Sequence, residues 1–254
     1  MSALLEVRDL TKCFDGLQVA AGLSLDLAAG DRTALIGPNG AGKTSFVNLV
    51  SGHLRPDAGT IRLAGADITR LAPAARVRQG LARSFQVTRL FPSLTAEEHV
   101  ALALLQREGR TGRLFGSYRA MPEVVDEARA ILGLLQLEGV AAVPAGAIAY
   151  GQQRLLEIAL VLALRPRVLL LDEPAAGVPH ADSALIERAL AHLPAELAVL
   201  LIEHDMEFVF RFARRVIVLV EGAIIFAGSA AEAAASPAVR EAYLGRSADG
   251  GGGA

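Results

Sequence analysis

The sequence is poor in cysteine and lysine, with one cysteine and two lysines among 254 residues. The single cysteine, Cys13, excludes an internal disulfide and a cysteine metal cluster, and it is consistent with a reducing compartment. We interpret it as a residue without a chemical role rather than as a nucleophile. The 25 basic and 27 acidic residues nearly balance, so the chain lacks the positive charge typical of nucleic-acid-binding proteins. We therefore expect no nucleic-acid partner.

The sequence also shows no pattern typical of a secretory signal or of a membrane-spanning segment. The first ten residues, MSALLEVRDL, carry acidic side chains and no long apolar core, which argues against a secretory signal. The apolar run 155–164 is much shorter than the roughly 20 residues of a spanning helix, and it contains Glu157. We expect a soluble chain, although a mean hydropathy of +0.40 suggests surfaces that are buried against partners.

The first third of the chain is typical of strands and of one strand-loop-helix unit. Residues 4–27 alternate around a turn at Asp15-Gly16, which predicts antiparallel strands. Residues 33–37 form an apolar run that ends in a glycine-rich loop, and a helix-like segment begins at Lys43. Residues 59–68 return to strand alternation.

The rest of the chain alternates helices and strands after a helical stretch. Between 91 and 149 the apolar spacing is helical, and one helix face carries Val124, Ala128, Ile131 or Leu132, and Leu135. Further helices are predicted at 152–164, 182–192 and 206–213, strands at 168–172 and 198–202, and a hairpin with Glu221-Gly222 at its turn. This order predicts an α/β fold with a mostly parallel sheet. We expect one domain over 3–245, a helical subdomain inserted at about 91–150, and a disordered glycine-rich tail at 246–254.

The stretch GPNGAGKT at 37–44 matches the phosphate-loop pattern G-x-x-x-x-G-K-[ST] between a predicted strand and a predicted helix. Backbone N–H groups of such a loop converge on phosphate oxygens, Lys43 reaches the β- and γ-phosphates, and the Thr44 hydroxyl can ligate Mg²⁺. The alternative is a glycine-rich turn with an accidental lysine. The residues expected at the phosphates are Gly37, Pro38, Asn39, Gly40, Ala41, Gly42, Lys43, Thr44 and Ser45.

Carboxylates follow the apolar strand in VLLLDEP. Ligands of parallel sheets bind beyond the carboxyl ends of the strands, so Asp172 and Glu173 are expected to face the nucleotide. Asp172 would hold Mg²⁺ directly or through water, and Glu173 would act as the general base toward the attacking water. The alternative is a solvated acidic turn before Pro174.

The same arrangement recurs one strand later, where LLIEHD places His204 beyond a strand end. We expect His204 to donate to the γ-phosphate and to hold the water. Gln86, between a strand-like segment and the helical stretch, could reach Mg²⁺ or water with its amide. The other histidines are interpreted as surface or packing residues: His53, His99, His180 and His192.

Together with the patch AYGQQ ahead of the acidic strand end, these motifs resemble those of the ATP-binding-cassette (ABC) ATPases, a P-loop NTPase fold with an antiparallel β subdomain and an inserted helical subdomain. The resemblance covers about residues 3–245. It implies that 37–44 is Walker A, Gln86 the Q-loop, AYGQQ the signature motif, Asp172-Glu173 Walker B with the catalytic glutamate, and His204 the switch histidine. Within the signature, Tyr150, Gly151 and Gln152 are the expected nucleotide contacts. Phe14 lies where the family stacks an aromatic ring on adenine, although by itself it could equally be a core residue.

Segments such as YGQQRLLEIALVLALRPRVLLLDEPAAGV and PAVREAYLG look like those of ATPase subunits of branched-chain amino acid importers; urea, amide, aromatic-acid and lipopolysaccharide systems are related. The resemblance implies ATP and Mg²⁺ as cofactors and a location at the cytoplasmic face of the inner membrane. It also implies two membrane permease subunits, a second ATPase chain and, indirectly, a periplasmic solute-binding protein. The alternatives are an ABC protein that acts in translation or DNA repair, and a regulatory subunit that binds ATP without hydrolysis.

Two positions depart from the family pattern. The signature usually has a serine where this chain has Ala149, and the loop after Walker B usually has Asp or Asn where Pro179 stands. Both motifs act on nucleotide that is held by the partner cassette. The sequence therefore favours an asymmetric heterodimer with two ATP half-sites. Walker A, Walker B and His204 of this chain would form one complete half-site, whereas its signature and its loop after Walker B would weaken the half-site that holds the partner's nucleotide.

Overall fold

The computed structural model describes residues 3–84, 90–110, 118–178, 180–237, 239 and 241. These residues divide into two compact units. The first unit contains the described residues within 1–82, 167–173 and 196–241, and the second contains those within 83–166 and 174–195. The chain therefore leaves the first unit twice, on either side of the short piece 167–173. The limits 3–245 and 91–150 remain predictions, and the tail at 246–254 lies outside the described residues.

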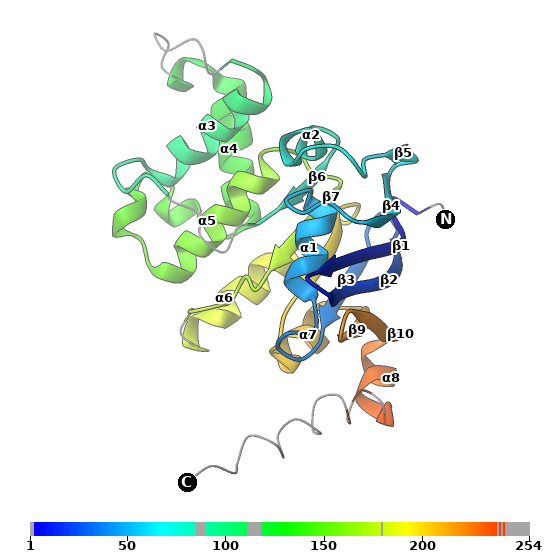
Figure 1. Cartoon of the computed structure of the whole chain (residues 1–254). Helices are drawn as coiled ribbons and strands as arrows, with labels where there is room; N and C mark the ends of the chain where they lie inside the picture. Colours follow the sequence, from blue (N-terminus) through cyan, green and yellow to red (C-terminus); the bar gives the residue numbers. More distant parts are fainter. Residues whose placement is uncertain are drawn as a thin grey trace. The chain divides into compact units, whose positions relative to one another are not determined.

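The first unit contains two sheets (Figure 1). Four strands form an antiparallel sheet in the order β2-β1-β4-β5: β1 (Leu5–Phe14), β2 (Leu17–Leu27), β4 (Ala58–Leu63) and β5 (Ala66–Asp67). The predicted strands of residues 4–27 and their turn at Asp15-Gly16 are confirmed. The predicted strand over 59–68 is instead two strands, because the chain turns at Ala64 and Gly65.

The larger sheet has the order β10-β9-β3-β8-β7-β6. It consists of β3 (Arg32–Ile36), β6 (Leu81–Arg83), β7 (Val168–Asp172), β8 (Ala198–Ile202), β9 (Arg215–Val220) and β10 (Ala223–Gly228). Strands β9, β3, β8 and β7 run parallel, and β10 pairs antiparallel with β9. The α/β fold with a mostly parallel sheet is confirmed, as are β7 and β8 over their predicted ranges.

The central strands of the larger sheet are apolar on both faces, as expected for strands covered on both sides. One face packs with α1 (Lys43–Ser51) and the antiparallel sheet in a single core, to which α1 contributes Phe46 and Leu49. The opposite face carries Ala34 and Ile36 and packs with residues of α7 (Met206–Phe212) and α8 (Ala230–Ala235). Burying a side chain such as Phe46 contributes about 1.5–3 kcal/mol, so α1 is held mainly by this core.

A buried arginine closes the C-terminal end of α1. Arg76 of α2 (Pro73–Arg78) is 2 % exposed. Its guanidinium donates to the carbonyl oxygens of Leu49 at 2.8 Å, Val50 at 2.6 Å, Thr69 at 2.7 Å and Leu71 at 3.0 Å. Burial lowers the pKa of Arg76 to about 10, which leaves it protonated at neutral pH. The cation therefore satisfies carbonyl groups at the negative end of the α1 dipole.

The second unit is helical and contains α3 (Ala96–Arg107), α4 (Pro122–Leu134), α5 (Tyr150–Leu162) and α6 (His180–Ala191). It also has short 3-10 turns at Tyr118–Ala120, Glu138–Val140 and Ala145–Ala147. The predicted apolar face of α4 is buried, as expected. Glu127 of α4 joins the ends of two other helices, because Arg107 donates to it at 2.6 and 2.9 Å and also to the carbonyl of Ala163 at 2.9 Å.

Candidate nucleotide site

The phosphate loop connects β3 to α1, as predicted. Two positions of the loop require glycine, because the backbone of a neighbouring strand lies too close for a Cβ atom. A Cβ on Gly37 would lie 2.1 Å from the carbonyl oxygen of Leu219, and one on Gly42 would lie 2.4 Å from that of Val19. Gly42 also has φ +101°, in the region that favours glycine, and it is the N-cap of α1. The loop is therefore wedged between β9 and β2.

The side chain of Lys43 lies along this loop. Its Nζ donates to the carbonyl oxygens of Gly37 at 2.6 Å and Pro38 at 3.0 Å. Burial lowers the pKa of Lys43, and the charges of Glu173 and Asp172 oppose that effect. The N–H groups of the first α1 turn have no partner within the helix, which makes this end suitable for an anion. The contact of Lys43 with phosphate stays a prediction.

The β1–β2 hairpin is fixed to the phosphate loop through the turn of the β9–β10 hairpin. Gly222 donates its N–H to the carbonyl of Ala41 at 2.9 Å, and its own carbonyl accepts from the N–H of Ala21 at 2.8 Å.

Phe14, at the end of β1, is 45 % exposed. The interpretation of Phe14 as a core residue is therefore wrong, and its ring is available to a ligand.

The two carboxylates after β7 have different environments. Asp172 is 4 % exposed, so the alternative of a solvated acidic turn is wrong for this residue. Glu173 has φ +48°, a conformation that costs a non-glycine residue about 1–3 kcal/mol. Its N–H donates to the carbonyl of Ile202 at 2.9 Å, which ties the strained residue to the end of β8.

His204 lies beyond the end of β8, as predicted, and beside Glu173. Its Nδ1 is 3.8 Å from Oε1 of Glu173 and 3.7 Å from Oε2 of Glu203. The His204 side chain is 67 % exposed, whereas that of Glu203 is 3 % exposed. The Glu203 carboxylate accepts from the N–H of His204 at 3.0 Å, and burial raises the pKa of Glu203. Asp205 caps α7 by accepting from the N–H groups of Glu207 and Phe208. Glu203 and Asp205 thus hold the turn that presents His204.

The signature patch lies in the second unit, at the start of α5. This helix begins at Tyr150 and not at the predicted Gln152, with Ala149 as its N-cap. The Gln152 side chain accepts from the Ala149 N–H at 3.1 Å, but alanine has no side-chain acceptor for the reciprocal bond. Tyr150 is 44 % exposed, and the Arg154 guanidinium carbon lies 5.3 Å from the centre of its ring. Gly151 is buried.

Some predicted residues are not described. Gln86 and Pro179 lie outside the described residues, as does the side chain of His180. The packing role of His99 is supported by its burial, and its Nε2 accepts from the N–H of Phe91 at 2.9 Å. The rings of His53 and His192 interact with the Ser51 hydroxyl and the Arg188 carbonyl, respectively.

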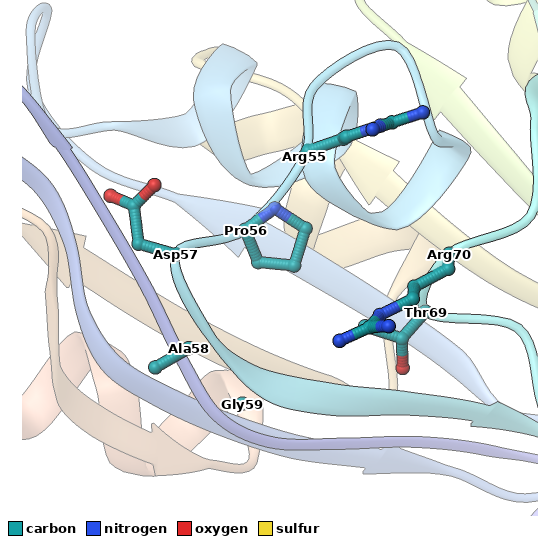
Figure 2. A pocket seen from close by; sticks show the side chains of 7 residues that line it. All are labelled: Arg55, Pro56, Asp57, Ala58, Gly59, Thr69 and Arg70. Atoms are coloured by element: carbon teal, nitrogen blue, oxygen red, sulfur yellow. The ribbon is translucent and has the colours of Figure 1, made fainter.

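Sequence reasoning missed Asp57, which lies between α1 and β4 and lines a hollow of about 340 Å³ (Figure 2). The hollow contains none of the predicted site residues. It is lined by Arg55, Pro56, Asp57, Ala58, Gly59, Thr69 and Arg70. The Asp57 carboxylate points away from the hollow, and its Oδ1 accepts from Nζ of Lys12 at 2.6 Å. The scarcity of lysine was the only signal that could have drawn attention to this pair.

Oxygen atoms suited to Mg²⁺ are present at the site. The buried carboxylate of Asp172 and the hydroxyl of Thr44 are the donor types that the ion prefers, alongside phosphate oxygens and water. No cluster of three or more His, Cys, Asp or Glu ligands occurs among the described residues, and a site completed by substrate phosphates does not need one.

No helix of the described chain is both long and apolar enough to span a bilayer.

A parallel sheet, a phosphate loop and strand-end carboxylates define a P-loop nucleotide-binding protein, and comparison with known proteins gives the family. Residues 20–176 match the ABC transporter family. The chain belongs to this family and is an ATP-binding subunit, with the fold of an ABC ATPase.

Its relatives align over almost the whole chain. It is 38 % identical to the high-affinity branched-chain amino acid transport ATP-binding protein BraF of Pseudomonas aeruginosa, over 95 % of this chain and 98 % of that protein. It is 33 % identical to the lipopolysaccharide export ATP-binding protein LptB of Acidithiobacillus ferridurans, over 96 % and 98 %. An ATP-binding cassette of an ABC transporter, solved in its ADP conformation, has a TM-score of 0.82 at 28 % identity, with 96 % and 100 % covered.

Proposed function

We propose that this chain hydrolyses ATP to ADP and phosphate and thereby drives the import of branched-chain amino acids or of a related small polar solute. The observation that carries the proposal is the placement of Glu173 and His204 at neighbouring strand ends of the unit that holds the phosphate loop. The domain that performs this reaction would span residues 3–245, with the helical subdomain at 91–150 inserted and the tail at 246–254 outside it.

The phosphate loop and Phe14 would bind the nucleotide. The loop residues 37–45 present N–H groups and Lys43 to the phosphates, and the exposed ring of Phe14 stacks on the base. Lys43 would exchange its two carbonyl partners for phosphate oxygens. Thr44, Asp172 and Gln86 would hold Mg²⁺, which neutralises phosphate charge when bound.

Glu173 would orient and deprotonate the attacking water as the general base. Its strained backbone, anchored to Ile202, fixes the carboxylate at the end of β7. His204 would donate to the γ-phosphate and keep the water in line with it. The Nδ1 of His204 lies within reach of the Glu173 carboxylate, so the two side chains can hold one water between them.

The hydrolase proposal is tested with Glu173→Gln in the assembled transporter. We expect phosphate release to fall by about a hundredfold or more while ATP binding persists, because the amide cannot accept the proton. Glu207→Gln, at an exposed acid two residues beyond Asp205, is the matched control and should retain the wild-type rate. Equal phosphate release from the wild type and from Glu173→Gln would contradict the proposal and favour a regulatory subunit.

The chain would act as a peripheral subunit on the cytoplasmic face of the inner membrane. Its partners would be two membrane permease subunits and a second ABC ATPase chain, with a periplasmic solute-binding protein acting indirectly. The names of BraF and of the similar LivG proteins support a branched-chain amino acid as the solute, and that of LptB supports lipopolysaccharide export as the alternative. Stimulation of the reconstituted ATPase by leucine with its binding protein, but not by lipopolysaccharide, would support import.

The second ATPase chain would be a different polypeptide. The N-cap alanine of α5 lacks the hydroxyl that a signature serine offers to the partner's nucleotide. A hydrogen bond to a charged phosphate is worth about 1.5–3 kcal/mol, or about ten- to a hundredfold in rate when it is felt in the transition state. Signature residues Tyr150, Gly151 and Gln152 would still contact that nucleotide, so its binding persists. This half-site would therefore turn over slowly.

The asymmetry is tested with Ala149→Ser in the complex. We expect a higher ATPase rate from the half-site that holds the partner's nucleotide, because this chain donates its signature to that half-site. Ala72→Ser is the control, because Ala72 is likewise an N-cap without a side-chain hydrogen bond, at the start of α2. Unchanged ATPase rate and unchanged nucleotide-driven dimerisation in Ala149→Ser would overturn the proposal.

A further inference from the structure

One of the two lysines of the chain lies directly behind the exposed ring of Phe14. The ammonium of Lys12 is 5.2 Å from the centre of that ring and lies over its face. The Lys12 side chain is only 15 % exposed, which is unusual for a lysine. The phosphate loop uses the other lysine, Lys43, so Lys12 needs its own explanation.

Asp57 fixes this lysine and the backbone next to it. One carboxylate oxygen accepts from Nζ of Lys12 at 2.6 Å, and the other accepts from the N–H of Cys13 at 2.8 Å. Both bonds lower the pKa of Asp57, so the carboxylate is ionised at neutral pH. A single aspartate thus holds the cation and the strand segment that leads to Phe14.

The strand geometry places the two side chains together. Lys12 and Phe14 are two residues apart on β1, and alternate residues of a strand share a face. The register with β2 shifts between Lys12, which is opposite Ala20, and Cys13, which is opposite Gln18. Val19 of β2, which lies between Gln18 and Ala20, is paired with no residue of β1. Its carbonyl is the group that approaches Gly42 of the phosphate loop. The same irregularity therefore positions the hairpin against the loop.

We propose that Lys12 is a positioning residue for base recognition, which holds the Phe14 ring from behind with its ammonium so that the opposite face of the ring stacks on adenine. This inference rests on the proposed ATP-binding function, and it adds a residue that selects for the base rather than for the phosphates. A cation on one face of an aromatic ring draws π density toward itself, which reduces repulsion between the other face and a purine. The fixed ring also loses less rotational freedom when the base binds.

The experiment compares ATP with inorganic tripolyphosphate, which carries the charge but no base. Each ligand displaces a fluorescent ATP analogue from the full chain. We expect Lys12→Met to raise the Kd for ATP about three- to tenfold and to leave that for tripolyphosphate within about twofold. Lys12→Arg, which keeps a cation over the ring, should stay within about twofold of the wild type for both ligands.

Two further variants separate the possible causes. Arg62→Met removes one exposed positive charge from β4 of the same sheet and should change neither Kd. Asp57→Asn keeps an acceptor for the Cys13 N–H but releases the lysine, so it should resemble Lys12→Met. Thermal unfolding of each variant without nucleotide checks that the fold is intact.

The outcomes distinguish this inference from the proposed function. Equal weakening of ATP and tripolyphosphate by Lys12→Met would show a purely electrostatic role and overturn the inference, as would no weakening of either. Phe14→Ala should weaken ATP alone. An effect of Phe14→Ala without one of Lys12→Met overturns only the role of Lys12. No effect of Phe14→Ala overturns both the base contact and the role of Lys12, whereas hydrolysis is judged separately by Glu173→Gln.

Discussion

Gly222 donates its backbone N–H to the carbonyl of Ala41 and so joins a hairpin turn to the centre of the phosphate loop. Its φ is +77°, and a Cβ would lie 2.9 Å from the carbonyl carbon of Val19. Both the backbone conformation and the space favour glycine. The turn is therefore a structural part of the nucleotide site, although it contains no predicted ligand-binding residue.

Gly222→Ala should lower the free energy of unfolding by about 2–4 kcal/mol, because backbone strain is added to a steric clash. It should also weaken ATP binding, because the loop loses its fixed neighbour. Gly16→Ala is the matched control: Gly16 has φ +89°, but nothing lies within 4 Å of its Cβ position. Urea unfolding measures both variants. A loss in Gly222→Ala no larger than that in Gly16→Ala would mean that contact with Val19 is unimportant.

Arg76→Met should destabilise the protein by about 3–5 kcal/mol, because it leaves the four carbonyl groups bonded by the buried guanidinium without their donor. The exposed Arg78 on the same helix provides the comparison, and Arg78→Met should change stability by no more than about 0.5 kcal/mol. Calorimetry would measure the difference. Similar melting temperatures for the two variants would contradict a structural role of Arg76.

Glu203→Gln should gain stability relative to the wild type as the pH rises. Burial raises the folded-state pKa of Glu203 above its unfolded value, so wild-type stability from this group is present at low pH and is lost as the carboxyl ionises. Glutamine does not titrate and can still accept from the His204 N–H. Urea unfolding from about pH 4 to about pH 7 follows the difference. Glu207→Gln, at an exposed acid, should show no such trend, and a trend of the opposite sign for Glu203→Gln would refute the assignment.

Glu127→Gln should lower stability by about 1–3 kcal/mol, because the amide cannot accept both Arg107 and Arg165 as the carboxylate does. Glu123 is a suitable control on the same helix, since its side chain is 62 % exposed and lies 3.5 Å from Arg110. Glu123→Gln should cost about 0.5 kcal/mol or less. Hydrogen exchange at the ends of α3 and α5 should increase only in Glu127→Gln; equal exchange in the two variants would contradict the role of Glu127.

The sequence predicted those parts of the site that depend on local pattern. The loop 37–44 and the strands 168–172 and 198–202 follow from spacing and apolar runs, and so does the placement of Glu173 and His204 at strand ends. The start of α5 was predicted less well, because Ala149 gives no capping signal and the helix starts before Gln152.

Contacts between distant residues could not be predicted. Asp57 and Lys12 are 45 positions apart, and no periodicity connects them. Arg76 stands in the segment PAARVR, where an exposed arginine is the ordinary expectation. It is buried because carbonyl groups from α1 and from the chain after β5 converge on it. Phe14 could be assigned to the core or to a ligand until its exposure was known, because an aromatic residue in a strand suits both roles.

The strand order of the larger sheet determines when the phosphate loop can become ordered during synthesis. The β3 strand, which leads into the loop, lies between β8 and β9, and both are made after the whole helical unit. A growing chain therefore exposes β3 without its neighbours until β8 and β9, within residues 198–220, have emerged from the ribosome. Such distant pairing makes folding slow and leaves strand edges open to aggregation. The nucleotide site can thus form only after β8 and β9 are made, although its phosphate loop is translated well before them.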